Sequence, residues 1–285
     1  MSQPDHNQEI IRHREYGGSG PRVVLLHGGP GAPGYMAALA NQLQHAFCVL
    51  EPFQRGSGAE PLTVARHVAD LSDFIASRCA DSRPALVGHS WGAMLALAFA
   101  AEHPGAVASL ALIGCGTFDL AARARMNEIV RERMGEDVPR RLERLRAQCD
   151  NPDDALAEMG RLIDPVYSFD AIPDEGEPVR CDAKGHEETW ADMLRLQSDG
   201  VYPAAFRRII CPVAMLHGAF DPHPGQMIRD GLRSLMPQLE YAEWEKCGHY
   251  PWREKAARDG FIAFLTSWLA EHAAGSDSSL RIQPA

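Results

Sequence analysis

The chain has 285 residues, of which 45% are hydrophobic and 23% are charged, so it is long enough for one large domain or one domain with an insertion. Its formal net charge of −10 argues against nucleic acid or an anionic membrane surface as the main partner. We expect a soluble, cytoplasmic protein with free thiols, because the polar start lacks signal-peptide features, no apolar run reaches about 20 residues, and the 7 cysteines form no C-x-x-C pair.

The first part of the chain alternates short apolar strands with helices. The expected strands cover 22–28, 47–52, 84–88 and 107–114, and the expected helices cover 33–45, 61–80 and 91–102. Pro61 is expected in the first turn of its helix, because proline suits that position. Strands that alternate with helices of this length predict a parallel sheet with right-handed crossovers.

From about Thr117 the composition shifts to Arg, Glu, Leu and Ala, which predicts helices without strands. These helices are expected at 119–134, 137–149, 151–163 and 186–199, with a loop at 164–185. The alternation then resumes with strands at 212–218 and 239–245 and helices at 224–236 and 252–272. We therefore expect a core formed by 1–116 and 206–274, a helical cap inserted at 117–205, and a disordered tail at 275–285.

A G-x-S-x-G sequence, Gly88-His89-Ser90-Trp91-Gly92, stands between an expected strand and an expected helix. This context favours a nucleophile elbow, a sharp turn that exposes the serine hydroxyl. Small flanking residues are needed because bulky ones would collide with the adjoining strand and helix. A chance match in a chain rich in Gly and Ala is the alternative. Ser90 is thus the candidate nucleophile, and His89 is expected to be a packed neighbour rather than the base.

The glycine-rich segment His27-Gly28-Gly29-Pro30-Gly31 follows the strand expected at 22–28. Glycines there let backbone N–H groups turn inward, as an oxyanion hole requires. The candidate donors are the N–H groups of Gly29 and of Trp91, the residue after the candidate nucleophile. A tight loop without catalytic meaning is the alternative. A phosphate-binding loop is disfavoured, because no Lys-Ser/Thr follows.

Two more candidates follow the last two expected strands. Asp221, just past 212–218, is the candidate that orients a histidine, and Asp119 is the runner-up for this role. His249 lies in a loop after 239–245 and is the candidate general base, although a loop histidine is more often solvated or structural. The order Ser90, Asp221, His249, each after a successive strand, favours the catalytic interpretation.

On these residues the chain resembles the α/β-hydrolases, and it is most similar to the proline iminopeptidase group. The residues that carry the narrower resemblance are 27–31, 88–92 and Gln54-Arg55-Gly56-Ser57-Gly58. The resemblance implies a mostly parallel central sheet flanked by helices, with a cap of helices over the site. It also implies a metal-independent serine hydrolase that forms an acyl-enzyme and needs no cofactor.

The expected substrate is a small molecule or a short peptide, because a cap would close the site. A small ester and an amino-terminal proline peptide are both open, as are a lactonase-type activity and a non-catalytic ligand-binding role. An acidic nucleophile, as in dehalogenases and epoxide hydrolases, is set aside because a serine occupies position 90. Cap residues considered for substrate binding are Glu187, Glu188 and Trp190, with Glu175 and Glu177 as further candidates. Solvated charges and a cap-anchoring aromatic are the alternatives.

Overall fold

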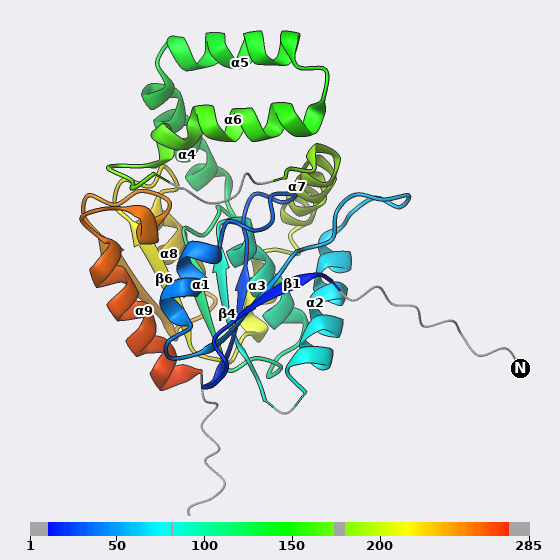
Figure 1. Ribbon diagram of the computed structural model, residues 1–285, viewed down its shortest axis with the longest axis vertical. Coiled ribbons are helices and arrows are strands. Elements are labelled where there is room, and N and C mark those ends of the chain that lie inside the picture. The colour runs from blue at the N-terminus through cyan, green and yellow to red at the C-terminus, as the bar shows by residue number, and fades with distance from the viewer. Residues whose placement is uncertain (1–10, 81, 174–179, 274–285) are drawn as a thin grey trace, which may run out of the picture.

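The computed structural model describes residues 11–80, 82–173 and 180–273 (Figure 1). The described residues form one seven-stranded sheet in the order β1-β3-β2-β4-β5-β6-β7. Its strands are β1 (His13–Tyr16), β2 (Arg22–Leu26), β3 (Cys48–Pro52), β4 (Ala85–His89), β5 (Ser109–Ile113), β6 (Val213–Gly218) and β7 (Leu239–Trp244). All neighbouring strands pair in parallel except β1, which pairs antiparallel with β3. The predicted mostly parallel sheet is confirmed.

Helices cover both faces of this sheet, because successive residues of a buried strand point to opposite sides. The flanking helices are α1 (Ala37–Leu43), α2 (Val64–Arg78), α3 (Trp91–Glu102), α8 (Gly225–Arg233) and α9 (Arg258–His272), with a short 3-10 turn η2 (Pro251–Arg253) before α9. Val24 and Leu26 of β2 belong to the core under α2, α3 and α8, whereas Val23 and Leu25 belong to the core under α1 and α9. α3 is buried on every side, as its Ala-rich sequence allows.

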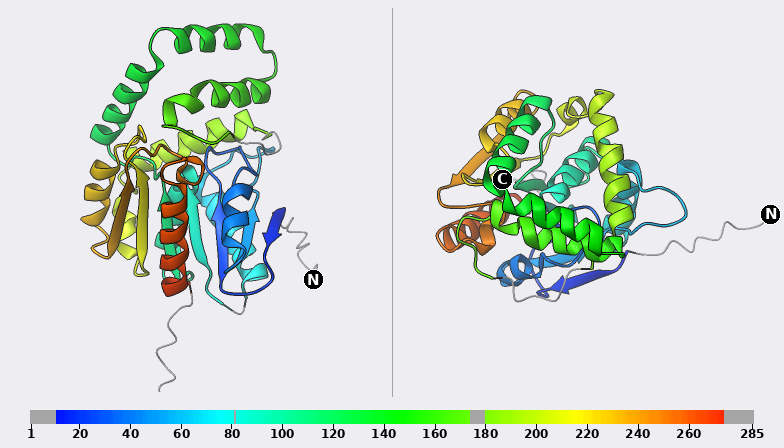
Figure 2. Two further views of the ribbon diagram at one scale, coloured as in Figure 1. Left: turned by 60° about the vertical axis from the view of Figure 1, so that its left-hand side comes forward. Right: turned by 90° about the horizontal axis from the view of Figure 1, so that it is seen from above.

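A block of helices is inserted between β5 and β6. It consists of α4 (Leu120–Met134), α5 (Asp137–Gln148), α6 (Pro152–Tyr167), α7 (Ala183–Ser198) and the 3-10 helix η1 (Ala204–Arg208). Figures 1 and 2 show α4, α5 and α6 beyond one end of the strands, apart from the helices that cover the faces of the sheet. Because the chain enters α4 from the carboxyl end of β5, this is the carboxyl end of the parallel strands. The tail at 275–285 lies outside the described residues.

Several predicted boundaries are wrong. α2 begins at Val64 because the Thr63 side chain accepts a hydrogen bond from the Arg66 N–H and caps the helix, so Pro61 lies outside its first turn. The loop expected at 164–185 is shorter, since α6 continues to Tyr167 and α7 begins at Ala183. Strand β1 was not among the expected strands.

Two further findings concern the cysteines and membrane-spanning helices. All seven cysteines lie within the described residues and are free thiols. Within 11–80, 82–173 and 180–273, no helix combines the length and apolar character needed to cross a bilayer.

Candidate active site

Ser90 occupies a strained turn between β4 and α3. Its φ of 54° and ψ of −116° lie in a region that L-residues rarely adopt. A Cβ on Gly88 would stand 2.3 Å from the Gly92 carbonyl oxygen, and one on Gly92 would stand 2.1 Å from the Leu26 carbonyl oxygen. The Ser90 N–H donates to the Ile113 carbonyl at 2.9 Å, which ties the turn to β5. The two glycines are therefore required by the backbone, as the elbow interpretation expects.

Asp221 and His249 meet in a buried contact past the ends of β6 and β7. The Nδ1–H of His249 donates to Asp221 Oδ2 at 2.6 Å, and both side chains are buried. Burial lowers the pKa of His249 below its usual value, although the Asp221 carboxylate opposes this. Burial alone would raise the pKa of Asp221, but the adjacent histidines hold it well below its usual value. The pair therefore consists of a carboxylate and a neutral imidazole, which is the state of a general base.

Two further histidines surround the Asp221 carboxylate. His223 donates to Oδ1 through its backbone N–H at 2.9 Å and through Nδ1 at 2.8 Å, and His217 Nε2 lies 3.5 Å from Oδ2. Such Asp and His donors also suit a metal ion. However, the rings of His223 and His249 stack at 4.7 Å with only 18° between their planes. In the described geometry both Nδ1–H groups donate to the Asp221 carboxylate, so these contacts are hydrogen bonds between the rings and that carboxylate.

Gly114 brings the His249–Asp221 pair close to the turn that carries Ser90. It directly follows Ile113, the residue that accepts the Ser90 N–H. A Cβ on Gly114 would stand 2.8 Å from His249 Nδ1 and 3.2 Å from Asp221 Oδ2. The three candidate residues, far apart in sequence, thus gather around the carboxyl end of β5. Sequence reasoning missed Gly114, and its position just past a strand is the only local signal that it offers.

His89 packs against His249, as expected, and links two loops. Its Nε2–H donates to the His249 carbonyl at 2.9 Å, so its Nδ1 is unprotonated and accepts the Tyr35 hydroxyl at 2.6 Å. The Gly28 N–H in turn donates to the Tyr35 oxygen at 2.6 Å. Burial holds the pKa of His89 well below its usual value, which is consistent with this neutral tautomer. The glycine-rich loop and the His249 loop are therefore joined by a continuous chain of hydrogen bonds.

Gln54 joins the two segments that contain the candidate oxyanion donors. Its Oε1 accepts the Trp91 indole N–H at 2.7 Å, and its Nε2 donates to the His27 carbonyl at 2.8 Å. Gly29 has a φ of +42°, within the left-handed region that favours glycine. Burial lowers the pKa of His27 to about 4, so its ring is neutral and Nε2 accepts the Gln54 N–H at 3.2 Å. Sequence reasoning placed Gln54 in a family motif but assigned it no contact.

Asp119 does not reach the histidine cluster. It is the N-cap of α4, and its side chain accepts the Ala122 N–H at 2.8 Å. Asp221, rather than this runner-up, is the carboxylate that contacts His249.

The candidate substrate-binding residues lie on α7. Glu188 Oε2 accepts the Leu62 N–H at 2.9 Å, so this glutamate connects α7 to the segment before α2. Trp190 stacks edge-on against Trp91 at 6.0 Å and packs on the core. Glu187 is exposed. Glu175 and Glu177 lie outside the described residues. The described contacts of Glu188 and Trp190 are those of anchoring groups.

Glu254 is a buried carboxylate that sequence reasoning also missed. It accepts the backbone N–H groups of Phe169, Asp170 and Gly248 at 2.8, 2.8 and 2.9 Å. The last of these precedes His249, so Glu254 fixes the loop that carries the imidazole to the end of α6. No local pattern distinguishes this glutamate from a solvated one.

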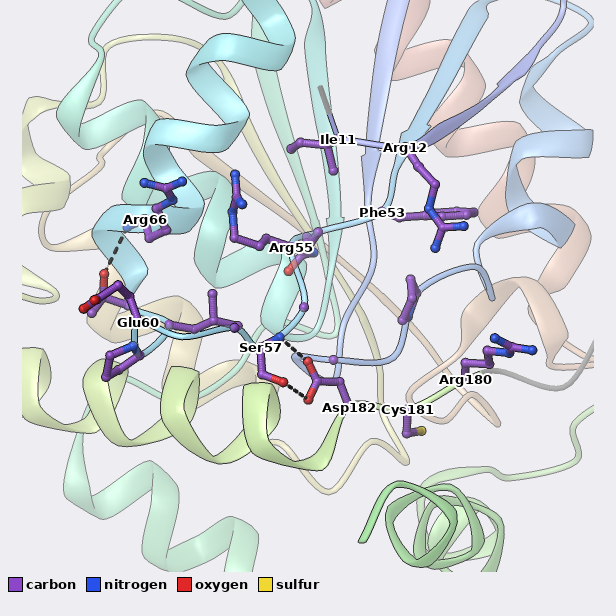
Figure 3. Close-up of a pocket in the computed structure, with 18 of the residues that line it drawn as sticks. Ile11, Arg12, Phe53, Arg55, Ser57, Glu60, Arg66, Arg180, Cys181 and Asp182 are labelled. Carbon is purple, nitrogen blue, oxygen red and sulfur yellow. Dashed lines mark hydrogen bonds between the residues drawn. The ribbon is translucent and has the colours of Figure 1, made fainter. Parts of the chain in front are cut away.

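A cleft of about 1090 Å³ opens beside the glycine-rich loop. Figure 3 shows it between the segment at Ile11 and Arg12, the loop after β3, and the segment at Arg180–Asp182. Gly31 and Gln54 line the cleft, whereas Ser90, Asp221 and His249 do not. The cleft therefore adjoins the glycine-rich loop without reaching the three candidate catalytic side chains.

The fold agrees with comparisons to known proteins. Residues 23–263 match the Alpha/beta hydrolase family. This protein is an α/β-hydrolase. It is 29% identical over 248 residues to a pimeloyl-[acyl-carrier protein] methyl ester esterase of Chromobacterium violaceum, a match that covers 82% of this chain and 89% of the relative. It is 26% identical to a 2-hydroxymuconate semialdehyde hydrolase of a Pseudomonas species, covering 95% and 96% of the two chains.

Other similarities are more limited. A probable aminopeptidase of Bacillus subtilis is 32% identical over 97 residues, which is 30% of each chain, so the narrower resemblance to proline iminopeptidases is not confirmed. Among solved structures, a thermophilic esterase of Thermogutta terrifontis superposes with a TM-score of 0.63 at 20% identity, covering 93% of this α/β-hydrolase and 94% of that chain. That likeness concerns the fold.

Proposed function

We propose that this α/β-hydrolase is a serine hydrolase that cleaves a small carboxylic ester through an acyl-enzyme. Ser90 is the nucleophile, His249 the general base and Asp221 the group that orients it. The observation that carries the proposal is the buried 2.6 Å contact between His249 Nδ1 and Asp221 Oδ2, next to the strained Ser90 turn. With Nδ1–H engaged by the carboxylate, Nε2 is left as the basic nitrogen.

The reaction proceeds in two halves. His249 Nε2 takes the hydroxyl proton of Ser90 while the serine oxygen bonds to the acyl carbon, and the backbone N–H groups of Gly29 and Trp91 stabilise the negative oxygen that forms. His249 returns the proton to the departing alkoxide, which leaves as an alcohol. A water molecule then gives a proton to His249 and attacks the acyl carbon, His249 passes that proton to the Ser90 oxygen, and the carboxylic acid leaves.

An ester is favoured over an amino-terminal peptide for two reasons. The relative named as a methyl ester esterase matches 82% of this chain, whereas the probable aminopeptidase matches 30%. In addition, both carboxylate oxygens of Glu188 are already engaged, Oε2 by the Leu62 N–H and Oε1 by the Lys184 ammonium group at 3.6 Å. We regard 117–205 as the cap, which restricts the site to a small acyl or alkyl group.

Labelling by a fluorophosphonate probe tests the assignment. The folded protein should be labelled at Ser90, and Ser90→Ala should lose both labelling and turnover of p-nitrophenyl acetate and butyrate. Ser234→Ala is a matched control, since the Ser234 hydroxyl only bonds the Gly231 carbonyl within α8 and its following turn. Absence of labelling in the folded wild type would overturn the serine mechanism and favour a ligand-binding role. Turnover of proline p-nitroanilide in place of the esters would redirect the substrate to a peptide.

A further inference from the structure

Asp182, the residue before α7, reaches across to the segment after β3. Its Oδ1 accepts the Ser57 hydroxyl and the Gly185 N–H, each at 2.9 Å, and its Oδ2 accepts the Ser57 N–H. Figure 3 shows this carboxylate pointing at Ser57. One side chain thus caps α7 and fastens that helix to the Gln54–Gly58 motif, which the proposed mechanism leaves without a role.

The start of α7 also holds the glycine-rich loop at two carbonyl groups. The Asp182 N–H donates to the Gly31 carbonyl at 2.8 Å. His186, one helical turn later, lies with Nδ1 2.9 Å from the Pro30 carbonyl, and Nδ1 is the donor because a carbonyl only accepts. Both accepting residues belong to the His27–Gly31 loop, in which Gly29 is the proposed oxyanion donor. The inserted helix is therefore in direct contact with that loop.

Glycines make this close approach possible. A Cβ on Gly31, whose φ is +85°, would stand 2.5 Å from the Asp182 carbonyl oxygen. A Cβ on Gly56 would stand 3.1 Å from Asp182 Oδ2, and one on Gly185 would stand 2.5 Å from the same oxygen. Each of the three chain segments that meet at Asp182 thus carries a glycine where it passes this residue. The contact therefore depends on a glycine in each of the two motifs, Gly31 in 27–31 and Gly56 in 54–58.

The charge of Asp182 is stabilised by its donors. Partial burial by itself would raise the pKa of this carboxyl, but the N–H groups of Gly185 and Ser57 and the Ser57 hydroxyl hold the pKa below its usual value. The carboxylate is therefore ionised at neutral pH and accepts all of these hydrogen bonds at once.

We propose that Asp182 and His186 are positioning residues that hold the His27–Gly31 loop in the geometry of an oxyanion hole. The inference rests on the proposed function, because it assumes that this loop donates to the reacting oxygen. A donor displaced by about 1 Å costs on the order of 10²-fold in rate. The start of the cap thereby governs turnover, and not only which substrates enter.

The test is a comparison of steady-state parameters for p-nitrophenyl acetate. Asp182→Ala and His186→Ala should each lower kcat by roughly 10- to 100-fold, with KM within about threefold of the wild type. Labelling by the fluorophosphonate, which also develops a negative oxygen, should slow in parallel. His186→Asn should recover most of the rate, because its amide nitrogen stands close to the position of Nδ1.

Asp153→Ala is the matched control. Asp153 Oδ1 accepts the Ala183 N–H at 2.8 Å, so it also holds the start of α7, but it contacts neither glycine motif. Its kcat should stay within about twofold of the wild type. Thermal unfolding of every variant shows whether it is folded. If Asp182→Ala fails to fold, His186→Ala and Ser57→Ala decide, because both leave the cap of α7 in place.

The outcomes separate this inference from the proposed function. A rise in KM with unchanged kcat would mean that the contacts shape only the entrance, and it would overturn the positioning role. The positioning role would also be overturned if the wild type is active and Asp182→Ala and His186→Ala keep its kcat as fully as Asp153→Ala does. A wild type that neither binds the probe nor hydrolyses esters would instead refute the proposed function.

Discussion

Gly114→Ala should displace the His249 imidazole without changing any of the candidate catalytic residues. The new methyl carbon would stand 2.8 Å from His249 Nδ1, 2.9 Å from Cε1 and 3.2 Å from Asp221 Oδ2. Since such atoms prefer about 3.5–4.0 Å, the imidazole must move by about 0.7 Å or more. A misplacement of this order costs on the order of 10²-fold in rate, or about 2.7 kcal/mol in activation free energy.

The control for this prediction is Gly135→Ala. Gly114 and Gly135 both have positive φ, +53° and +56°, and Gly135 has a ψ of −148°, so alanine strains the backbone at either position. A Cβ on Gly135 meets nothing within 4 Å. Both variants should therefore lose stability in urea unfolding, but only Gly114→Ala should lose kcat/KM on p-nitrophenyl butyrate and slow its fluorophosphonate labelling. Equal activity in the two variants would refute the placement of the imidazole against β5.

Four other expectations concern charged or titratable groups. Asp221→Asn should lower kcat on the order of 10³- to 10⁴-fold, whereas Asp119→Asn should cost less than about tenfold; the reverse would reinstate the runner-up. Because burial lowers the pKa of His249, the acid limb of kcat/KM should have its midpoint below 6.5, and a midpoint above that value in a pH–rate series would contradict the buried geometry. Burial lowers the pKa of His67 to about 4, so the unfolded chain alone binds that proton between pH 6.5 and about 4. Stability must therefore fall on acidification, and His67→Gln should flatten the slope by about 1.4 kcal/mol per pH unit in urea titrations; an unchanged slope would show that the ring titrates normally. Glu254→Gln leaves one or more buried N–H groups poorly paired and should lower the free energy of unfolding by about 1–3 kcal/mol, and wild-type stability would count against that role.

The parts of the molecule that could be predicted are those whose signals are local. A buried strand shows as a short apolar run, and β2, β3, β5, β6 and β7 all lie within ranges expected from such runs, while β4 ends one residue past its expected range. The Ser90 turn was predicted because its steric needs fall on its own neighbours, Gly88 and Gly92. Asp221 was preferred to Asp119 on its position after a strand, and the contact with His249 agrees with that preference.

The parts that could not be predicted depend on partners far away in the sequence. Asp182 was assigned to the loop expected at 164–185. Its bonds to Ser57 span 125 positions and therefore leave no local signal in the sequence. The glycine at 114 is required by an imidazole that arrives from the loop after β7. Boundaries also failed where two local rules competed: the Thr63 cap set the start of α2 in place of Pro61, and α6 accommodates Pro165 within its last turn.

The hydrogen-bond chain from Gly28 through Tyr35 and His89 to the carbonyl of His249 has a practical consequence for engineering. Three stretches of the chain, 28–35, His89 and His249, share one proton arrangement, in which each donor faces one acceptor. The acceptor in the His249 loop is a backbone carbonyl, so a loop transplanted from a relative can keep this bond if it keeps the backbone position of His249. Recombination of this enzyme should therefore keep Tyr35 and His89 together, because their bond joins two side chains.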